Sequence, residues 1–507
     1  MKKTVLKRIA CAVLSAILIL TPVVSGYAAG MEAKIPIVHV RGVGEEIYKN
    51  PGTDKQEAVF PPSTQAILKL VGQISLPLGK LAATRDWDAF AYSLADAVNV
   101  FFADFACNPD GTSKENVGID WSYPEIKEHY TKGDTYIFSY DWRLDPYEIA
   151  AQLNDFIDYV IEGTGCKKVS INAHSMGGVV TATYISVYGC DKLYSVVMDS
   201  TAVLGGSVAG EPFAGKVDIN DVALTRTINQ VLPANEVGEF IESILNLLLK
   251  AGVIGGITGA ANYIVDNVID ILYEESLGQI FATCPGVWSL ITASEYDAAK
   301  ELLLKDTELY GELIKKIDRY HNNVRLKAAD ILRSVLDSGT ILVIISKYNL
   351  QVPPVIESWN ISTDGVLDSA STSFGATFAP LGETLGWQYK QAVKDGHCHV
   401  SPDLKVDAST CLFPEYTWFI KNLQHSETPD DLTEMSVTLA YAKTQPDVRT
   451  YKEYPQFLTY ERDTEMIRPT LLPDIALGDS WFVVTADVAV STVKLAAYIY
   501  SMINSAA

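Results

Sequence analysis

Short apolar segments alternate along this chain with segments whose apolar residues recur at helical spacing. Six segments are rich in β-branched residues and apolar on both faces, as buried parallel strands are; they cover residues 34–40, 135–140, 168–173, 195–198, 340–346 and 417–420. Residues 146–161 and 177–188, which lie between them, have helical periodicity. The alternation predicts an α/β fold with a mostly parallel central sheet and helices on both faces.

A long helical block interrupts this alternation between residues 219 and 338. Residues 236–250 have one apolar face, and residues 298–304 and 326–336 repeat that pattern with charged outer faces. Because the block falls between two strands of the predicted sheet, we expect it to form a helical cap, or lid, over the carboxyl ends of the strands. An independent helical domain is the alternative.

The first thirty residues have the layout of a secretory signal peptide. A basic start is followed by the apolar run 9–20 and by the small residues Ala28, Ala29 and Gly30. The run is too short for a spanning helix, although an uncleaved anchor is the alternative. The sequence therefore predicts a secreted, extracellular protein.

The predicted organisation has five parts. They are a signal peptide (1–30), a first part of the core (31–218), the cap (219–338), a second part of the core (339–429) and a C-terminal extension (430–507). In the extension, residues 435–442 alternate like a strand and residues 488–503 have a helical pattern.

Composition and charge narrow the class of protein. The 507 residues are 48% hydrophobic and 20% charged, which are the proportions of a folded globular chain. The net charge of −22 repels phosphate backbones, so nucleic acid is not an expected partner. No stable protein partner is predicted either.

The cysteines suggest disulfide bonds in an oxidising compartment. Loss of Cys11 with the signal leaves six, an even number. Closeness in sequence pairs Cys398 with Cys411, and neighbouring strand starts pair Cys166 with Cys190. Cys107 and Cys284 then pair by elimination. Free buried thiols are the alternative.

The sharpest chemical signal is the segment Ile171-Asn-Ala-His-Ser-Met-Gly-Gly178. It follows a predicted strand and begins a predicted helix, with small residues two positions on either side of Ser175. A tight strand-to-helix turn of this kind, a nucleophile elbow, exposes a serine hydroxyl at the edge of a sheet. The amide of Met176, at the start of the helix, is then a candidate oxyanion donor. An ordinary glycine-rich turn is the alternative.

Two motifs resemble known families. The string Ala-His-Ser-Met-Gly-Gly resembles the elbow of small secreted bacterial lipases, and Tyr140-Asp-Trp-Arg-Leu144 resembles a signature of the lecithin:cholesterol acyltransferase family. The resemblance covers about residues 33–205 and 340–428. It implies an α/β-hydrolase fold with a lipase-like site.

The resemblance also places the remaining parts of such a site. The segment Arg41-Gly-Val-Gly44 aligns with a His-Gly-x-Gly loop of these lipases, with Arg where they have His, so the amide of Val43 is the second candidate oxyanion donor. A plain glycine turn is the alternative. Asp364, in Asp-Gly-Val, resembles the family's acid turn, and Asp368 is its competitor, interpreted as an exposed loop residue.

The general base must follow the acid in the chain, because this fold orders the triad as Ser, acid, His. Of the histidines after Asp364, His425 follows a predicted strand directly, as the base of this fold does, and His399 is the alternative. His397 and His399 form a His-x-His with Asp395, Asp403 and Asp407 nearby, but no third fixed spacing supports a metal site. No metal is predicted.

These assignments predict a secreted serine hydrolase that cleaves acyl esters through an acyl-enzyme, as lipases, carboxylesterases and phospholipases do. Ser175, His425 and Asp364 would form the triad, and no cofactor is required. The substrate would be a lipid or another acyl ester. The protein would contact a lipid interface transiently through the cap. A lipid acyltransferase of the same fold and a non-catalytic secreted binding module are the alternatives.

Overall fold

A mostly parallel, eight-stranded sheet forms the centre of the protein, as the alternation predicts. The computed structural model describes residues 35–126, 134–230, 242, 245–246, 248–250, 252–394 and 396–471. The strand order is β13-β12-β11-β8-β7-β6-β1-β5. All neighbouring pairs are parallel except β12 and β13. The strands are β1 (Ile37–Val40), β5 (Thr135–Phe138), β6 (Val169–His174), β7 (Leu193–Asp199), β8 (Ile341–Tyr348), β11 (Thr417–Lys421), β12 (Phe457–Glu461) and β13 (Met466–Pro469).

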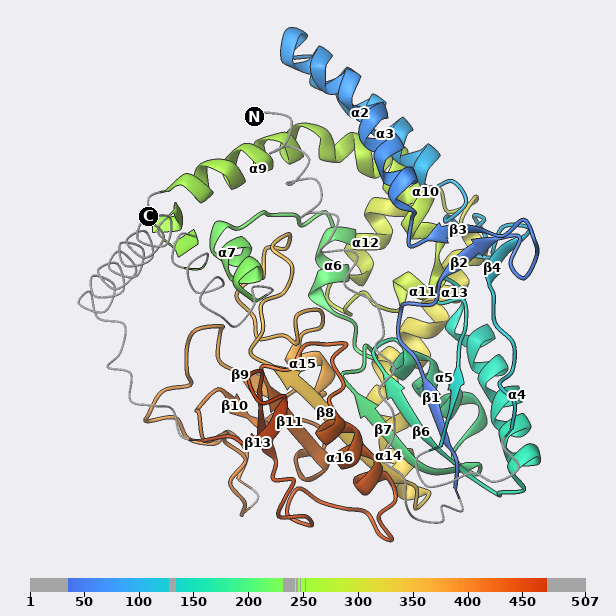
Figure 1. Ribbon diagram of the computed structural model, residues 1–507, viewed down its shortest axis with the longest axis vertical. Coiled ribbons are helices and arrows are strands. Elements are labelled where there is room, and N and C mark those ends of the chain that lie inside the picture. The colour runs from blue at the N-terminus through green and yellow to red at the C-terminus, as the bar shows by residue number, and fades with distance from the viewer. Residues whose placement is uncertain are drawn as a thin grey trace, which may run out of the picture.

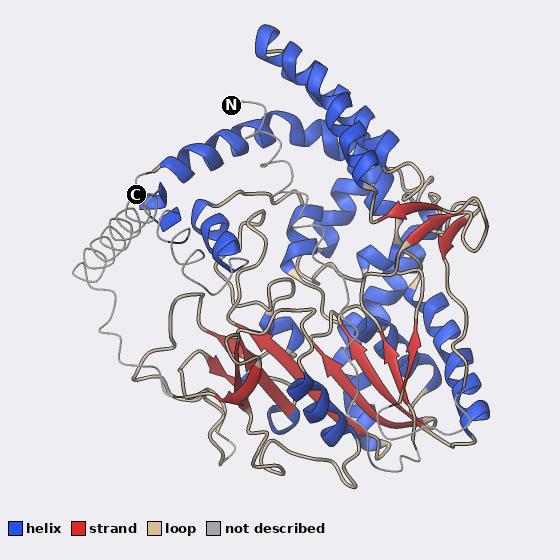
Figure 2. Cartoon of the chain, viewed as in Figure 1, coloured by secondary structure: helices blue, strands red, loops and turns tan. Residues whose placement is uncertain are grey.

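Helices cover both faces of the sheet. Successive side chains of a strand point to opposite faces, and in the central strands the side chains on both faces are buried. Val196 and Met198 of β7 belong to a large core that includes α4 (Pro146–Thr164), α5 (Gly177–Tyr188) and α14 (Ala328–Asp337). Val197, between them, packs in a second core with Leu432 and Leu439 of α16 (Asp430–Ala440). Apolar residues therefore lie on both faces of the sheet, as is typical of a parallel sheet covered on both sides. Figure 2 shows the helices on either side of it.

Strong local signals set the bounds of helix α4, which flanks the sheet. Asp145 caps its first turn by accepting a hydrogen bond from the amide of Tyr147, and Pro146 occupies the first helical position. Gly165 ends the helix in the left-handed conformation, with φ of 69°.

An excursion between β1 and β5 builds a structure that the sequence pattern does not predict. It contains a three-stranded antiparallel sheet of β2 (Ile47–Lys49), β3 (Glu57–Phe60) and β4 (Val117–Ile119). Between β3 and β4 the chain forms a helical hairpin of α2 (Thr64–Thr84) and α3 (Trp87–Phe101). Figure 1 shows this hairpin projecting away from the central sheet.

The chain from β7 to β8 is mostly helical, as predicted. Its helices are α6 (Ser207–Phe213), α7 (Asp221–Gln230), α9 (Val253–Leu272), α10 (Gly278–Ile280), α11 (Pro285–Trp288), α12 (Tyr296–Leu303), α13 (Gly311–Asn323) and α14. A π-helical turn, Tyr273–Leu277, joins α9 to α10. Helix α9 runs across the side of the molecule to which the strands' carboxyl ends point, and α3 packs against it (Figure 1). Most of the predicted helix 236–250 lies outside the described residues.

The C-terminal part corrects one prediction. Residues 435–442 do not form a strand; most of them lie in α16, where Leu432, Met435 and Leu439 form a buried face at helical spacing. Two acidic residues in the first turn, Asp430 and Asp431, favour the helix. After α16, β12 and β13 extend the central sheet. The short elements α15 (Ser369–Thr372), β9 (Thr377–Phe378) and β10 (Val406–Asp407) lie between β8 and β11. The predicted signal peptide and the predicted helix 488–503 lie outside the described residues.

The predicted disulfides are not found: within the described residues, no cysteine is disulfide-bonded. The thiol of Cys190 interacts with Ser338, and the Sγ of Cys411 lies 3.8 Å from the hydroxyl of Thr417. Cys107 and Cys284 are hydrogen-bonded to each other as thiols in the buried core. None of the three predicted pairs is therefore disulfide-bonded within the described residues, although Cys107 and Cys284 are in contact.

Candidate active site

Ser175 occupies a strained turn between β6 and α5. Its φ is 55°, in the left-handed region that costs a residue with a side chain about 1 kcal/mol or more. The turn leaves no room for side chains on the following glycines. A Cβ on Gly177 would lie 2.0 Å from the carbonyl oxygen of Val40, and one on Gly178 would lie 2.2 Å from the Cβ of Thr201. The small residues of the motif are thus required by close packing.

The loop after β1 lies directly against Ser175. A Cβ on Gly42 would lie 2.5 Å from the Cβ of Ser175 and 2.9 Å from its hydroxyl oxygen, so only glycine fits there. Val43 follows in this loop, and Met176 follows Ser175 in the chain. Both candidate oxyanion donors therefore belong to segments that touch or continue from the serine.

The Tyr-Asp-Trp-Arg segment holds that loop in place. The hydroxyl of Tyr140 donates to the carbonyl of Arg41 at 2.7 Å, and the indole nitrogen of Trp142 donates to the carbonyl of Glu45 at 3.1 Å. The buried guanidinium of Arg143 is paired with Asp141 at 2.6 Å, which anchors the segment. The motif thus acts on the geometry of residues 41–45 rather than on a substrate.

His425 and Asp364 form a buried pair. The Nδ1 of His425 lies 2.6 Å from the Oδ2 of Asp364, and the amide of His425 donates to the carbonyl of Asp364 at 2.8 Å. The other oxygen of Asp364 accepts hydrogen bonds from the amides of Val366 and Leu367. Burial disfavours the Asp364 carboxylate, but the charge of His425 and these hydrogen bonds together hold its pKa below the usual value. Asp364 is therefore suited to orient an imidazole and to remain ionised.

The imidazole of His425 lies beside the serine turn. Its ring centroid is 4.6 Å from that of His174, the residue that precedes Ser175. The structure thus places the pair of Asp364 and His425 beside the residue that precedes Ser175 in the chain.

A buried lysine near this site was missed by the sequence analysis. The ammonium group of Lys347, in β8, is fully buried and donates to the carbonyls of His425 and Glu427 at 2.8 and 3.0 Å. It also lies 3.7 Å from Asp199, whose other oxygen is 3.5 Å from the Nδ1 of His174. The sequence did contain a signal for this residue, because Lys347 directly follows the apolar segment 340–346 and a charged residue in a buried strand is unusual.

The charges in this cluster balance one another. Burial opposes ionisation of Asp199, yet the charge of Lys347 and the contact with His174 hold its pKa well below the usual range. Burial in turn lowers the pKa of His174, so that ring is neutral near pH 7. Lys347 therefore neutralises Asp199 and fixes the backbone of His425 at the same time.

Asp368 is not an exposed loop residue, contrary to the sequence interpretation. It is buried, and its Oδ2 accepts hydrogen bonds from the amide and the hydroxyl of Ser207 at 3.0 and 2.7 Å. Burial raises the pKa of Asp368 to about 6. Its contacts join the segment after β8 to the start of α6, and no histidine is among its hydrogen-bond partners.

His399, the alternative base, lies in a different environment. Its Nδ1 is 2.8 Å from the side-chain oxygen of Gln456, and its Nε2 is 3.6 Å from Glu415. Glu415 precedes β11, whereas His425 follows it. The two histidines therefore lie toward opposite ends of β11, and His399 is not part of the Ser175 cluster.

Comparisons with known proteins do not show a family for this chain. No known family pattern matches the chain, and no curated protein matches it. Among solved structures, a chain from the crystal structure of the Tle4-Tli4 complex is similar at 13% identity with a TM-score of 0.26. The similarity covers 62% of this chain and 75% of that one. The fold class supported by the strand order and by the packing is α/β.

Proposed function

We propose that this protein is a serine hydrolase of the α/β-hydrolase fold that cleaves acyl esters. The observation that carries the proposal is the buried pair of His425 and Asp364 beside the strained turn of Ser175. A serine hydroxyl is a poor nucleophile unless a base takes its proton, and a base needs an acid to orient it. The order Ser, Asp, His along the chain agrees with this fold.

In the proposed mechanism, Ser175 attacks the acyl carbonyl while His425 takes the hydroxyl proton. Asp364 keeps the imidazole in the tautomer with hydrogen on Nδ1 and stabilises the imidazolium that forms. The amides of Val43 and Met176 donate to the oxyanion of the tetrahedral intermediate. His425 then returns the proton to the leaving alcohol, and an acyl-Ser175 ester remains. Water completes hydrolysis, whereas a second alcohol would complete acyl transfer.

The alternative of a non-catalytic binding module is less well supported. Backbone strain at Ser175 costs free energy, and the burial of Asp364 and Lys347 also costs free energy that a binding surface would not require. Such costs are typical of sites where side chains must be held in one geometry.

Labelling with a fluorophosphonate separates the two functions. The protein is expected to form one covalent adduct, in which the Ser175 oxygen bonds to phosphorus and fluoride leaves. Intact mass and peptide mapping measure the adduct, with Ser175→Ala as the blank and Ser207→Ala as a matched serine control. A folded protein that remains unlabelled would favour the binding module.

Exposed apolar side chains on three helices support contact with a lipid surface. They lie on the α2–α3 hairpin and on α9, which meet where Trp87 packs edge-on against Tyr263. We call this surface the apolar arm, and it consists of Leu68, Leu76, Leu78, Tyr92, Ile257, Tyr263 and Ile264. Within the described residues, α2 is the one helix long and apolar enough to cross a membrane by length and composition.

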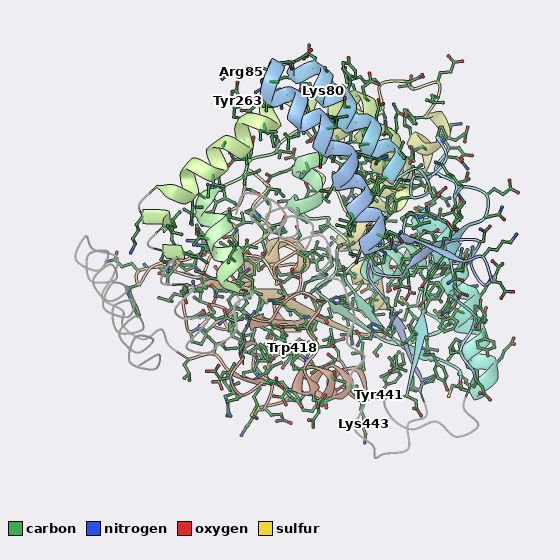
Figure 3. The ribbon with its side chains drawn as sticks, turned by 45° about the horizontal axis from the view of Figure 1, so that its top comes forward. Lys80, Arg85, Tyr263, Trp418, Tyr441 and Lys443 are labelled. Atoms are coloured by element: carbon green, nitrogen blue, oxygen red, sulfur yellow. The ribbon has the colours of Figure 1, made fainter. Side chains whose placement is uncertain are left out.

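The apolar arm fits interfacial contact better than a buried interior. Leu68 and Leu76 are 59% and 68% exposed, and within the described residues α2 packs mainly against α3, with a smaller contribution from α9. The arm also has Lys80 and Arg85 at its tip, far from Trp418 in the sheet (Figure 3). Apolar residues with flanking basic residues are typical of helices that lie in a lipid interface. We propose that the arm and the cap contact the lipid of an extracellular substrate.

Activity on an insoluble ester is therefore expected to rise sharply when the substrate passes its solubility limit. The double variant Leu68→Glu, Leu76→Glu should lose that rise but keep its activity on a soluble short-chain ester. Initial rates across the solubility limit test this. Leu309→Glu, which changes a similarly exposed leucine outside the arm, is the matched control. A smooth saturation curve for the parent protein would instead indicate a fixed cap and a soluble substrate.

A further inference from the structure

Two histidines and a glutamate from separate segments meet outside the proposed active site. They are His397 and His399, on a loop before β10, and Glu415, in the turn that precedes β11. One ligand atom from each lies within 4.8 Å of the other two. The sequence analysis considered the His-x-His but had no third ligand, because Glu415 is brought to it only by the fold.

The tautomer of His399 follows from its neighbour Gln456. The amide nitrogen of Gln456 donates to the carbonyls of Pro414 and Thr417 at 2.7 and 3.1 Å, so its side-chain oxygen is the acceptor facing His399. The Nδ1 of His399, 2.8 Å from that oxygen, must therefore carry hydrogen. In the neutral ring, the Nε2 then has a lone pair.

That lone pair points toward a carboxylate. The Nε2 of His399 is 3.6 Å from the Oε1 of Glu415, and the same oxygen is 2.5 Å from the Nδ1 of His397. A nitrogen lone pair and a carboxylate oxygen at this distance repel unless a proton or a metal cation lies between them. An imidazole that donates from one nitrogen to an amide oxygen and offers the other nitrogen is the usual arrangement of a metal-binding histidine.

We propose that His397, His399 and Glu415 bind one divalent zinc-type ion. Two imidazole nitrogens and one carboxylate oxygen are a donor set that zinc prefers. Tetrahedral coordination places ligand atoms about 3.4 Å apart, so a small movement of the half-exposed His397 closes the site. The fourth position is left for water or for a further carboxylate.

Binding of this ion would change one contact of Arg449 and keep another. Its guanidinium lies 3.0 Å from the Oε2 of Glu415 and also contacts the Nε2 of His397. A His397 ring that binds metal through Nδ1 keeps its hydrogen on Nε2, so the contact with Arg449 is released. The contact of Arg449 with Glu415 then orients the carboxylate from outside the coordination sphere.

The ion would have a structural role. Glu415 precedes β11 and His425 follows it, so a five-residue strand, about 16 Å long, separates the metal site from the proposed active site. The ion would join the loop of residues 397–399 to the turn before β11, and through Gln456 to the start of β12. That is the kind of cross-link that the sequence analysis assigned to a disulfide between Cys398 and Cys411.

Zinc binding to the full-length protein tests the proposal. The protein, stripped with a chelator and titrated with Zn²⁺ by calorimetry, is expected to bind one equivalent and to gain thermal stability. Glu415→Gln and His399→Ala should weaken binding by at least about 100-fold, and Gln456→Leu by about 10- to 100-fold. His321→Ala, which changes a helical histidine outside the site, is the matched control and should bind like the parent. Co²⁺ in place of Zn²⁺ should give the visible absorption of a tetrahedral site.

Two results would overturn the inference. One is a parent protein that binds no Zn²⁺, which would mean that a proton and Arg449 occupy the place of the ion. The other is one-equivalent binding that persists in the Glu415 variant. Because the ring of His399 is buried, the fold of His399→Ala is checked by circular dichroism. If that variant does not fold, His397→Ala, which changes a half-exposed residue, is titrated with Zn²⁺ in its place.

Discussion

Ser175→Ala is expected to abolish ester hydrolysis while the fold remains intact. Removing the nucleophile of a triad costs about a millionfold in turnover, because the remaining groups have no oxygen to which the acyl group can be transferred. Alanine is smaller than serine and adds no atom to the contacts with Gly42, so the packing around the turn is preserved. Turnover of an activated ester, with circular dichroism as the check on folding, measures the effect.

The same experiment can contradict the assignment. The positive φ at position 175 is as strained for alanine as for serine, so the substitution does not change the backbone preference of the turn. A loss of rate can then be assigned to the missing hydroxyl. Ser207→Ala, at the start of α6, removes a hydroxyl that contacts Asp368 and is the matched control. Activity of Ser175→Ala within tenfold of the parent would show that another residue is the nucleophile.

The second large effect is expected at His425. Replacing it with alanine should slow acylation by at least about 10⁴-fold, because the hydroxyl of Ser175 loses the base that takes its proton. The buried carboxylate of Asp364 also loses its partner at 2.6 Å, so some loss of thermal stability should accompany the loss of rate. The burst phase with an activated ester measures acylation directly.

His399→Ala is the comparison that makes this prediction specific. His399 interacts with Gln456 and Glu415 near the other end of β11, so its removal should leave acylation within about tenfold of the parent at a temperature where the variant is folded. If His399→Ala is inactive and His425→Ala is active, the base belongs to the loop before β10. In that case the pairing of His425 with Asp364 has only a structural role.

Local patterns were sufficient for the parts of this protein that depend on neighbours in the chain. The six strands of the predicted sheet appear as β1, β5, β6, β7, β8 and β11, since buried parallel strands are apolar on both faces wherever they occur. The turn of Ser175 was also visible, because its close contacts leave glycine as the residue that fits at positions 177 and 178. The choice of His425 over His399 stays a prediction, and it combined a local observation, the position after a strand, with the place of the base in the resembled fold.

Residues 430–442 show where local patterns fail. An apolar residue at every second position and an apolar face at helical spacing both include Met435 and Leu439, so short segments of this kind are ambiguous. Packing of that face against β7 and β8 decides for the helix α16. The α2–α3 hairpin was missed because the sequence analysis located helices between apolar strand segments, and no such segment flanks this hairpin. Its own apolar residues do recur at helical spacing.

Tertiary structure alone decided which side chains meet. Asp364 and His425 are 61 positions apart, Lys347 and His425 are 78 apart, and His399 and Gln456 are 57 apart. Such contacts depend on the register of neighbouring strands and on where each loop leaves the sheet, and neither is written in a local pattern. For the same reason the cysteines that are close in sequence are not paired, and Glu415 joins two histidines that the sequence left without a third ligand. The sequence thus determined the types of residue and the strands that carry them, and the sheet determined the distances on which their chemistry depends.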